Sequence, residues 1–222
     1  DQLLDRLASL ERVLTADLAE ADRLARLPDS VVRALIEQEL FRLWIPKSCG
    51  GLELDLPDAL RVYEAAAAID GSVGWAVMIG SGGGLFAAYL DAQTAREMFC
   101  RPDAVIAGSG MPQGKAERVN GGYRVTGRWR YASGAHYATT FTAACVVTRD
   151  DEPVLDDSGN SVVRAMAFEP SDVRILPTWD TTGMRGTGSH DFEVTDVFVP
   201  ERRTFSVFTD APRESGPLYR LP

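Results

Sequence analysis

The stretch TWDTTGMRGTGSHDFEV, residues 178–194, places three glycines within six positions, a density at which a chain could cradle a phosphate. A dinucleotide-binding loop needs the spacing G-x-G-x-x-G between a strand and a helix, so that the pyrophosphate meets the helix N-terminus. Here the spacing is G-x-x-G-x-G, the stretch contains no P-loop lysine, and the β-branched run up to Pro200 predicts a strand. We therefore predict tight turns that enter a strand, and not a nucleotide phosphate loop.

The cysteine and histidine residues do not predict a metal centre. Cys49, Cys100 and Cys145 are far apart and form no C-x-x-C pair, so neither a zinc site nor a disulfide framework is indicated. The histidines, His136 and His190, are expected to be satisfied polar side chains, and we assign neither a catalytic role.

The overall charge excludes further classes of protein. A formal net charge of −9 argues against a nucleic-acid partner, because phosphate neutralisation requires a basic surface. No apolar run is expected to reach the roughly 20 residues that cross a bilayer. The N-terminus, DQLLDRLASLERVL, is charged from its first residue, unlike a secretory signal peptide. We therefore expect a cytoplasmic protein with no membrane partner.

The first half of the chain has the periodicity of helices. Leucines at helical spacing between charged residues predict an amphipathic helix, and Pro57 and Asp91 are typical of the first turn and the N-cap of later helices. The almost uncharged stretch 74–90 predicts a buried helix. The predicted helices cover residues 2–27, 30–40, 57–69, 74–90 and 91–99.

The second half has the alternation and turn signals of strands. Asn120-Gly121 lies between alternating segments and predicts a hairpin, and at least three further apolar runs follow it. We predict an α+β fold: an all-helical domain at 1–103, an antiparallel β domain at 104–205 and an irregular exit segment at 206–222.

Two segments carry a resemblance to a known family. Residues 106–134, IAGSGMPQGKAERVNGGYRVTGRWRYASG, are similar to the small-residue segment, hairpin and tryptophan-centred strand by which the acyl-CoA dehydrogenase superfamily contacts its flavin. Residues 181–200, TTGMRGTGSHDFEVTDVFVP, are similar to the segment that closes its β domain. Both follow a D-G-S-x-G-W turn at 70–75. The resemblance covers essentially the whole chain and implies the first two domains of that fold, with the C-terminal helical bundle absent from this chain.

Three details are more similar to the flavin-dependent monooxygenases built on this fold. They are the W-x-aromatic-x-S-G form of residues 129–134, the Gly-Trp pair at 74–75 and the R-G-T-G-S run at 185–189. These enzymes take reduced flavin from a separate reductase, add dioxygen at flavin C4a and oxygenate a small organic substrate through a C4a-hydroperoxyflavin. The resemblance therefore implies FMN or FAD, a flavin reductase as partner, and a homo-oligomer (dimer or tetramer) when the protein is full length.

Two other functions stay open at this point. An acyl-CoA dehydrogenase would use FAD for α,β-desaturation, but that group favours a T-E-P-x-x-G-S-D segment where this chain has SGMPQGK, residues 109–115. A non-catalytic truncated binding module would bind no flavin. The superfamily carries its general base in the third domain, so we assign no base here.

The resemblance implies a flavin site around the strand of Trp129. An isoalloxazine needs apolar walls and a few donors and acceptors at its polar edge and N5. In an alternating strand Trp129 and Tyr131 share one side, and Ser133 is a small donor beside a glycine. We predict Ser133 as the catalytic contact to N5 or to the bound oxygen. The predicted cofactor-binding residues are Ser109, Gly110, Met111, Pro112, Gly114, Trp129, Tyr131, Ala132, Ser133, Trp179 and Arg185.

The predicted substrate pocket includes Trp75 and Gly83. Several aromatic hydroxylases of this group place a histidine eight positions after the Gly-Trp tryptophan, and Gly83 occupies that position here. We therefore expect a roomier pocket and a substrate other than a phenol. Alternatives stay open: the tryptophans could be ordinary packing residues, and Arg185 could contact flavin phosphate, a neighbouring subunit or solvent.

An acidic loop separates two of the predicted strands. Residues 150–160, DDEPVLDDSGN, contain four aspartates and a glutamate. Such a loop would repel an anionic cofactor. We expect it to be exposed to solvent and distant from the flavin.

Overall fold

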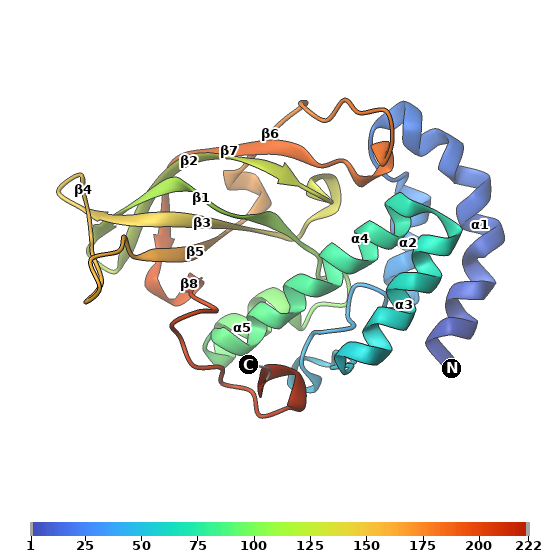
Figure 1. The fold of residues 1–222 in the computed structure, drawn as a ribbon, viewed down its shortest axis with the longest axis horizontal. Coiled ribbons are helices and arrows are strands. Elements are labelled where there is room, and N and C mark those ends of the chain that lie inside the picture. Colours follow the sequence, from blue (N-terminus) through green and yellow to red (C-terminus); the bar gives the residue numbers. More distant parts are fainter. Residues whose placement is uncertain (1, 221–222) are drawn as a thin grey trace.

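The computed structural model describes residues 2–220, in which a group of helices is followed by a sheet (Figure 1). Asp55, Asp70 and Asp91 begin three of the helices, because their carboxylates accept the first free backbone N–H groups. The helical half of the predicted fold is confirmed. The helices are α1 (Gln2–Leu24), α2 (Asp29–Glu37), α3 (Leu56–Ile69), α4 (Gly71–Gly82) and α5 (Ala92–Phe99).

Helix α4 continues into the 3-10 helix η2 (Gly83–Tyr89) along the middle of the molecule. The segment Gly71–Tyr89 has 19 residues and a mean hydropathy of 1.2, enough by length and composition alone to cross a membrane. Our expectation that no run approaches that length was therefore wrong. Of this segment 61% is buried inside the protein, as in a core helix.

The strands within residues 2–220 form one eight-stranded sheet in the order β6-β7-β2-β1-β3-β5-β8, with β4 paired to β3. The predicted hairpin turn at Asn120-Gly121 joins β1 to β2, and Gly121 has a positive φ of 78°, which glycine adopts without strain. The strands are β1 (Ile106–Val119), β2 (Gly122–Ala132), β3 (Thr140–Arg149), β4 (Glu152–Pro153), β5 (Val163–Phe168), β6 (Arg174–Leu176), β7 (His190–Pro200) and β8 (Thr204–Phe205).

One pair of strands departs from the predicted antiparallel arrangement: β1 and β3 are parallel. Strand β3 follows β2 in the chain and returns in the opposite direction, but it pairs on the far side of β1. Because β1 is itself antiparallel to β2, β3 must run parallel to β1. The α+β class is confirmed, and its sheet is mixed.

The sheet opens between β1 and β2. Their pairing ends at Gly114↔Gly127, after which β2 continues along β7 alone. Strand β1 bulges here, and within residues 2–220 its segment Gly110–Gln113 pairs with no strand. We call the opening between Gly110–Gln113 on β1 and Arg128–Tyr131 on β2 the seam. The ladder does not use the backbone groups of the bulge, and apart from Met111 N, which donates to Ser109 Oγ at 3.4 Å, they are available to a ligand.

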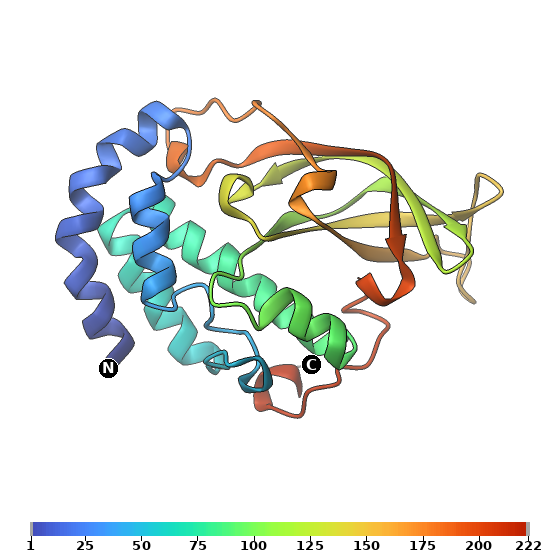
Figure 2. The same ribbon diagram turned by 180° about the vertical axis from the view of Figure 1, so that it is seen from behind.

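Helices and sheet share part of their core. One buried cluster joins Ile45 and Phe99 of the helical part to Ile106, Ala167 and Phe205 of the sheet. Figures 1 and 2 show the sheet lying over α4 and α5, with α1, α2 and α3 beyond. The change from helix to strand falls between Phe99 and Ile106, beside the predicted boundary at 103/104. That the two parts are separate domains stays a prediction.

A buried arginine fastens the loop after α2. Arg42 is only 5% exposed. Its guanidinium donates to the carbonyl oxygens of Arg101 and Cys49, each at 2.7 Å, and of Phe99 at 3.3 Å. The Phe99 carbonyl belongs to the last turn of α5, where a helix presents negative partial charge, and the Arg101 carbonyl follows that turn.

The acidic loop is exposed, as predicted. Residues 150–160 are exposed apart from the half-buried Val154. The loop lies at the end of the sheet remote from α1 (Figure 1). Its distance from a flavin stays a prediction. The described part of the exit segment is mostly irregular, as predicted, and ends in a short 3-10 helix, Pro217–Arg220, whose Tyr219 hydroxyl donates to Trp44 O at 3.3 Å.

Candidate functional site

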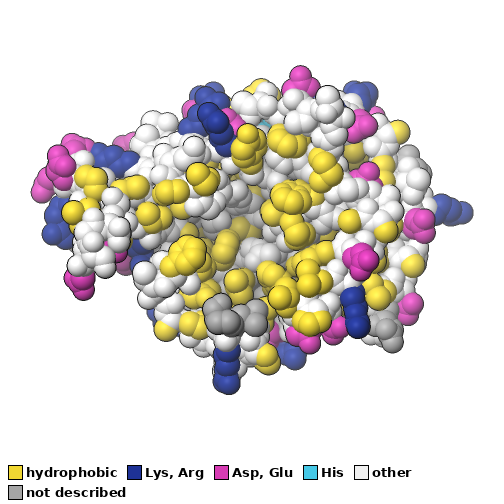
Figure 3. Space-filling model, viewed as in Figure 1, with side chains coloured by type: hydrophobic (Ala, Val, Ile, Leu, Met, Phe, Trp, Pro, Cys, Tyr) yellow, Lys and Arg dark blue, Asp and Glu magenta, His cyan; other side chains and the backbone are white. Residues whose placement is uncertain are grey.

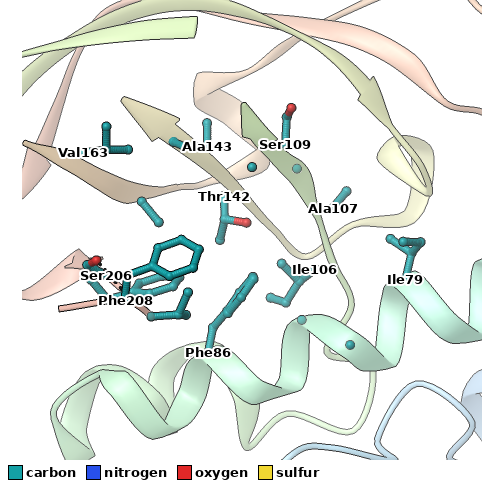
Figure 4. A pocket seen from close by; sticks show the side chains of 18 of the residues that line it. Ile79, Phe86, Ile106, Ala107, Ser109, Thr142, Ala143, Val163, Ser206 and Phe208 are labelled. Atoms are coloured by element: carbon teal, nitrogen blue, oxygen red, sulfur yellow. Dashed lines mark hydrogen bonds between the residues drawn. The ribbon is translucent and has the colours of Figure 1, made fainter. Parts of the chain in front are cut away.

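An apolar cavity of about 330 Å³ lies between α4 and the sheet. Figure 3 shows hydrophobic side chains gathered around the hollow between these elements. In Figure 4, Ile79 and Phe86 line it from the helical side, and Thr142 and Ala143 line it from the sheet. No aspartate, glutamate, lysine, arginine or histidine of the described residues lines this cavity, so an uncharged molecule suits it best.

A second, polar cavity of about 460 Å³ lies on the β2 side of the seam. Gln113, Arg130 and Tyr131 line it from the two strands. Arg128, also on its wall, is paired with Asp191 at 2.8 Å. The guanidinium of Arg130 has no hydrogen bond or ion pair with any residue of 2–220 and is therefore available to an anion. Gly110 of the β1 bulge lines the apolar cavity, and Gln113 of the same bulge lines this polar one.

Four polar side chains form a continuous chain next to the seam. The Trp75 indole N–H donates to Ser133 Oγ at 2.8 Å, and Ser133 Oγ lies 2.7 Å from Ser189 Oγ. Ser189 Oγ lies 2.7 Å from Thr187 Oγ1. Ser133, Ser189 and Thr187 are all buried. The structure thus brings the predicted residues Trp75 and Ser133 into direct contact, and it adds Ser189, which lines the polar cavity.

The hydroxyl chain has one arrangement that leaves a hydrogen for a ligand. If Thr187 donates to Ser189 and Ser189 donates to Ser133, then Ser133 accepts from both Ser189 and Trp75. Its own hydrogen is then unused by these partners. Ser189 belongs to the R-G-T-G-S run, but no local pattern joins that run to Ser133.

An exposed tyrosine and a half-buried tryptophan line the polar cavity beside the seam. Tyr131 is 63% exposed, and its ring meets the edge of Trp179 at 6.2 Å between centroids. The Trp179 backbone N–H donates to His190 Nδ1 at 3.0 Å, which requires that nitrogen to be unprotonated. Burial lowers the pKa of His190 and favours the same neutral form. His190 therefore fixes the segment that carries Trp179.

Three predicted flavin contacts lie in the core instead. The Trp129 side chain is 0% exposed and donates to Ala144 O at 2.9 Å. Gly114 is buried, and a Cβ there would stand 2.1 Å from the Trp129 ring. Ala132 is 0% exposed. These side chains therefore pack inside the sheet domain, and a contact of the three residues with the flavin stays a prediction. By contrast, Ser109, Gly110, Met111, Pro112 and Tyr131 are half-buried or exposed.

Arg185 is held by the protein itself. Its guanidinium donates to Asp22 O at 2.9 Å, and to Asp180 Oδ1 at 2.7 Å and Thr181 O at 2.9 Å. These bonds fasten the loop before β7 to α1. A role of Arg185 at a flavin phosphate stays a prediction, and Arg130 has the more available guanidinium.

The glycine-rich loop makes tight turns before β7, as predicted. Gly188 has φ of 54°, and a Cβ at Gly186 would meet Ser72 at 2.9 Å. Gly83 lines the apolar cavity, but a Cβ there would meet Ile106 at 2.5 Å. Gly82, also on the cavity wall, has no heavy atom within 4 Å of its Cβ position. The extra space in the pocket that we expected at Gly83 therefore lies beside Gly82.

Comparison with known proteins identifies the family. Residues 7–97 match the family described as acyl-CoA dehydrogenase, N-terminal domain. Over its whole length the chain is 34% identical to a pigment production hydroxylase of Rhodococcus sp., of which it spans 57%. The chain belongs to the acyl-CoA dehydrogenase superfamily. Over 97% of its length it is 32% identical to HsaA of Mycobacterium tuberculosis, named as the oxygenase subunit of a flavin-dependent monooxygenase, of which it spans 56%.

A solved structure of the same superfamily has the same fold. XiaF from Streptomyces sp., in complex with FADH2 and glycerol, matches 99% of the chain with a TM-score of 0.90 and 33% identity. The chain covers 56% of XiaF, so it spans little more than half the length of the relatives it matches. The predicted superfamily and its monooxygenase branch are confirmed. The roles of individual site residues stay predictions.

Proposed function

We propose that this chain forms the flavin-facing part of a monooxygenase that uses reduced FMN or FAD and dioxygen to oxygenate a small organic substrate. The observation that carries the proposal is the seam. Unpaired backbone groups of β1, an exposed aromatic side chain and a buried hydroxyl chain meet there, in a fold whose relative XiaF has been solved with FADH2.

The residues at the seam fit an isoalloxazine with a phosphate-bearing side chain. Unpaired backbone groups of Gly110–Gln113 suit its hydrogen-bonding edge, and Met111, 62% exposed, and Tyr131 offer apolar surface. Arg130 offers a free cation for phosphate. Reduced flavin, when bound, supplies the two electrons with which dioxygen is activated.

The protein has two tasks around such a cofactor: to hold a proton at a fixed position and to keep water away. Ser133 and Ser189 are suited to the first, because their hydroxyls are buried and bonded on several sides. The walls of the apolar cavity are suited to the second. Substrate would occupy the apolar cavity, next to Ser109 and Gly110 of the β1 bulge.

The name of one relative also bears on the source of the reduced flavin. HsaA is named as an oxygenase subunit, which implies a separate flavin reductase as its partner. We propose the same arrangement for this protein, together with a cytoplasmic location and a homo-oligomeric assembly. A sedimentation run that found only monomer would contradict the assembly.

The function is tested by the rate at which dioxygen reoxidises the bound reduced flavin. Protein of natural length, in excess over reduced FMN or FAD, is mixed with aerated buffer in a stopped-flow spectrometer. We expect the oxidised-flavin spectrum to return roughly tenfold or more slowly than with free flavin, equivalent to about 1.4 kcal/mol of barrier. In parallel, octanoyl-CoA is added anaerobically to protein with oxidised FAD, and no bleaching is expected.

Three results would contradict this function. Reoxidation of the bound flavin at the rate of free flavin would exclude the proposed oxygenase function. Bleaching by octanoyl-CoA would assign a dehydrogenase instead. Absence of saturable flavin binding would assign a non-catalytic binding module.

A further inference from the structure

Gly82 is the one glycine of α4 and η2, among the described residues, that no neighbouring atom explains. A Cβ at Gly74 would meet Ala67 at 2.5 Å, at Gly80 it would meet Phe41 at 2.5 Å, and at Gly84 it would meet Ile45 at 2.7 Å. Gly71 and Gly83 have similar close neighbours. At Gly82 the space is open, and this space belongs to the apolar cavity.

A glycine without such a neighbour is unfavourable in a helix. Glycine is less favourable than any residue except proline in a helix interior, because its backbone loses the most entropy on folding. Gly82 ends α4 and continues into η2 with a helical φ of −58° and ψ of −37°. Alanine at this position would meet no heavy atom within 4 Å beyond its own helix and chain neighbours, and it would suit the helical backbone better. The opposite wall repeats the pattern: a Cβ at Gly110 on β1 would also have no heavy atom within 4 Å. Two bare backbone surfaces therefore line one cavity.

The cavity contains one hydroxyl that the protein does not use. Ser109 Oγ accepts from Met111 N at 3.4 Å, and Ser206 Oγ accepts from Thr209 N at 3.3 Å. The Thr142 hydroxyl has no hydrogen-bond partner within residues 2–220. Figure 4 shows the Thr142 side chain projecting between the sheet and the helix side. A polar group so placed suits a polar group on a ligand.

We propose that Gly82 sets the width of the substrate and that Thr142 receives its polar group. The substrate class is an uncharged, mainly apolar molecule wider than one aromatic ring, with one hydrogen-bonding group. This inference rests on the proposed function, because it names the substrate of that site.

The size of the cavity supports more than one ring. An apolar cavity of about 150 Å³ accommodates a single benzene. The cavity here has about 330 Å³, roughly twice that volume. The absence of charged side chains from its described walls disfavours a carboxylate, a phosphate or an amine.

The width is tested with Gly82→Leu and Gly82→Ala in the natural-length protein. Carbazole, with three fused rings, and phenol, with one, are the probes, and their dissociation constants are measured by equilibrium dialysis. Gly82→Leu is expected to weaken carbazole binding roughly tenfold or more and to change phenol binding less than about twofold, because only the wider ligand needs the space. Gly82→Ala should lie between wild type and Gly82→Leu. Ala68→Leu, on the exposed face of α3, is the control.

The polar contact is tested with fluorene, which has the shape of carbazole but a methylene in place of the N–H. We expect wild type to prefer carbazole by about three- to tenfold, the worth of one hydrogen bond. Thr142→Val keeps the shape of the side chain and should abolish this preference, whereas Thr142→Ser should retain it. A preference unchanged in Thr142→Val would remove Thr142 from recognition.

The two proposals fail in different ways. Carbazole affinity that is unchanged in Gly82→Leu, or absent in wild type, would overturn the substrate proposal even when reduced flavin binds. Gly82-dependent carbazole binding in a protein that binds no reduced flavin would support the cavity as a site for this ligand class and would overturn the oxygenase function.

Discussion

Ser133→Ala is expected to release hydrogen peroxide from bound reduced flavin about ten- to a hundredfold faster than wild type. Ser133 Oγ accepts from Trp75 Nε1 and contacts Ser189 Oγ, so the substitution breaks the hydroxyl chain at its centre. A buried polar group left without its partner loses about 1–3 kcal/mol. Each 1.4 kcal/mol corresponds to about tenfold in rate. Folding should be nearly unchanged, because one oxygen atom is removed.

The measurement uses protein in excess over reduced FMN, no substrate, and a coupled peroxide assay after mixing with dioxygen. Ser158→Ala, in the exposed acidic loop, is the matched control and should behave as wild type. Trp75→Phe removes the N–H donor and should shift the rate in the same direction as Ser133→Ala. A peroxide rate in Ser133→Ala equal to that of the control would exclude Ser133 from the mechanism.

Arg42→Met is expected to reduce the free energy of unfolding by about 3–5 kcal/mol. The substitution keeps most of the apolar stem but leaves the carbonyls of Cys49, Phe99 and Arg101 without the donor that now satisfies them. For a chain of this size, roughly 2–4 °C of melting temperature is lost per kcal/mol. A decrease of about 6–20 °C should therefore appear in a thermal melt.

Arg12→Met provides the control for Arg42→Met. Arg12 is exposed on α1. The Arg12→Met variant should therefore have a melting temperature within about 1–2 °C of wild type, because surface substitutions commonly change stability little. Equal melting temperatures for the two variants would show that the three carbonyls are satisfied in another way.

Local signals predicted much of the fold. The helix starts at Asp70 and Asp91 follow from short-range hydrogen bonds of capping carboxylates, and the turn at Gly121 follows from its backbone conformation. The parallel pairing of β1 with β3 depends on which side of β1 the chain returns to. No local pattern determines that choice.

The candidate site was predicted less completely, for a similar reason. Strand alternation placed Trp129 and Tyr131 on one side, but Tyr131 has a φ of 66° and the pairing with β7 shifts between Trp129 and Ala132. This irregularity turns Tyr131 outward while Trp129 stays in the core. Pairing of Arg185 with α1 and the contact of Gly83 with Ile106 are also long-range and have no signature in the sequence.

We propose that the seam between β1 and β2 binds reduced flavin, and an anaerobic titration measures this binding. Reduced FMN and reduced FAD are titrated into the natural-length wild type, Gly110→Phe and the control Ala68→Phe. A phenyl group at Gly110 meets no protein atom within 4 Å of its Cβ and occupies the space beside the bulge. We predict saturable binding to wild type and control, weakened at least about tenfold, or about 1.4 kcal/mol, in Gly110→Phe. Equal affinity of Gly110→Phe and wild type, or no binding to wild type, would contradict flavin binding at the seam.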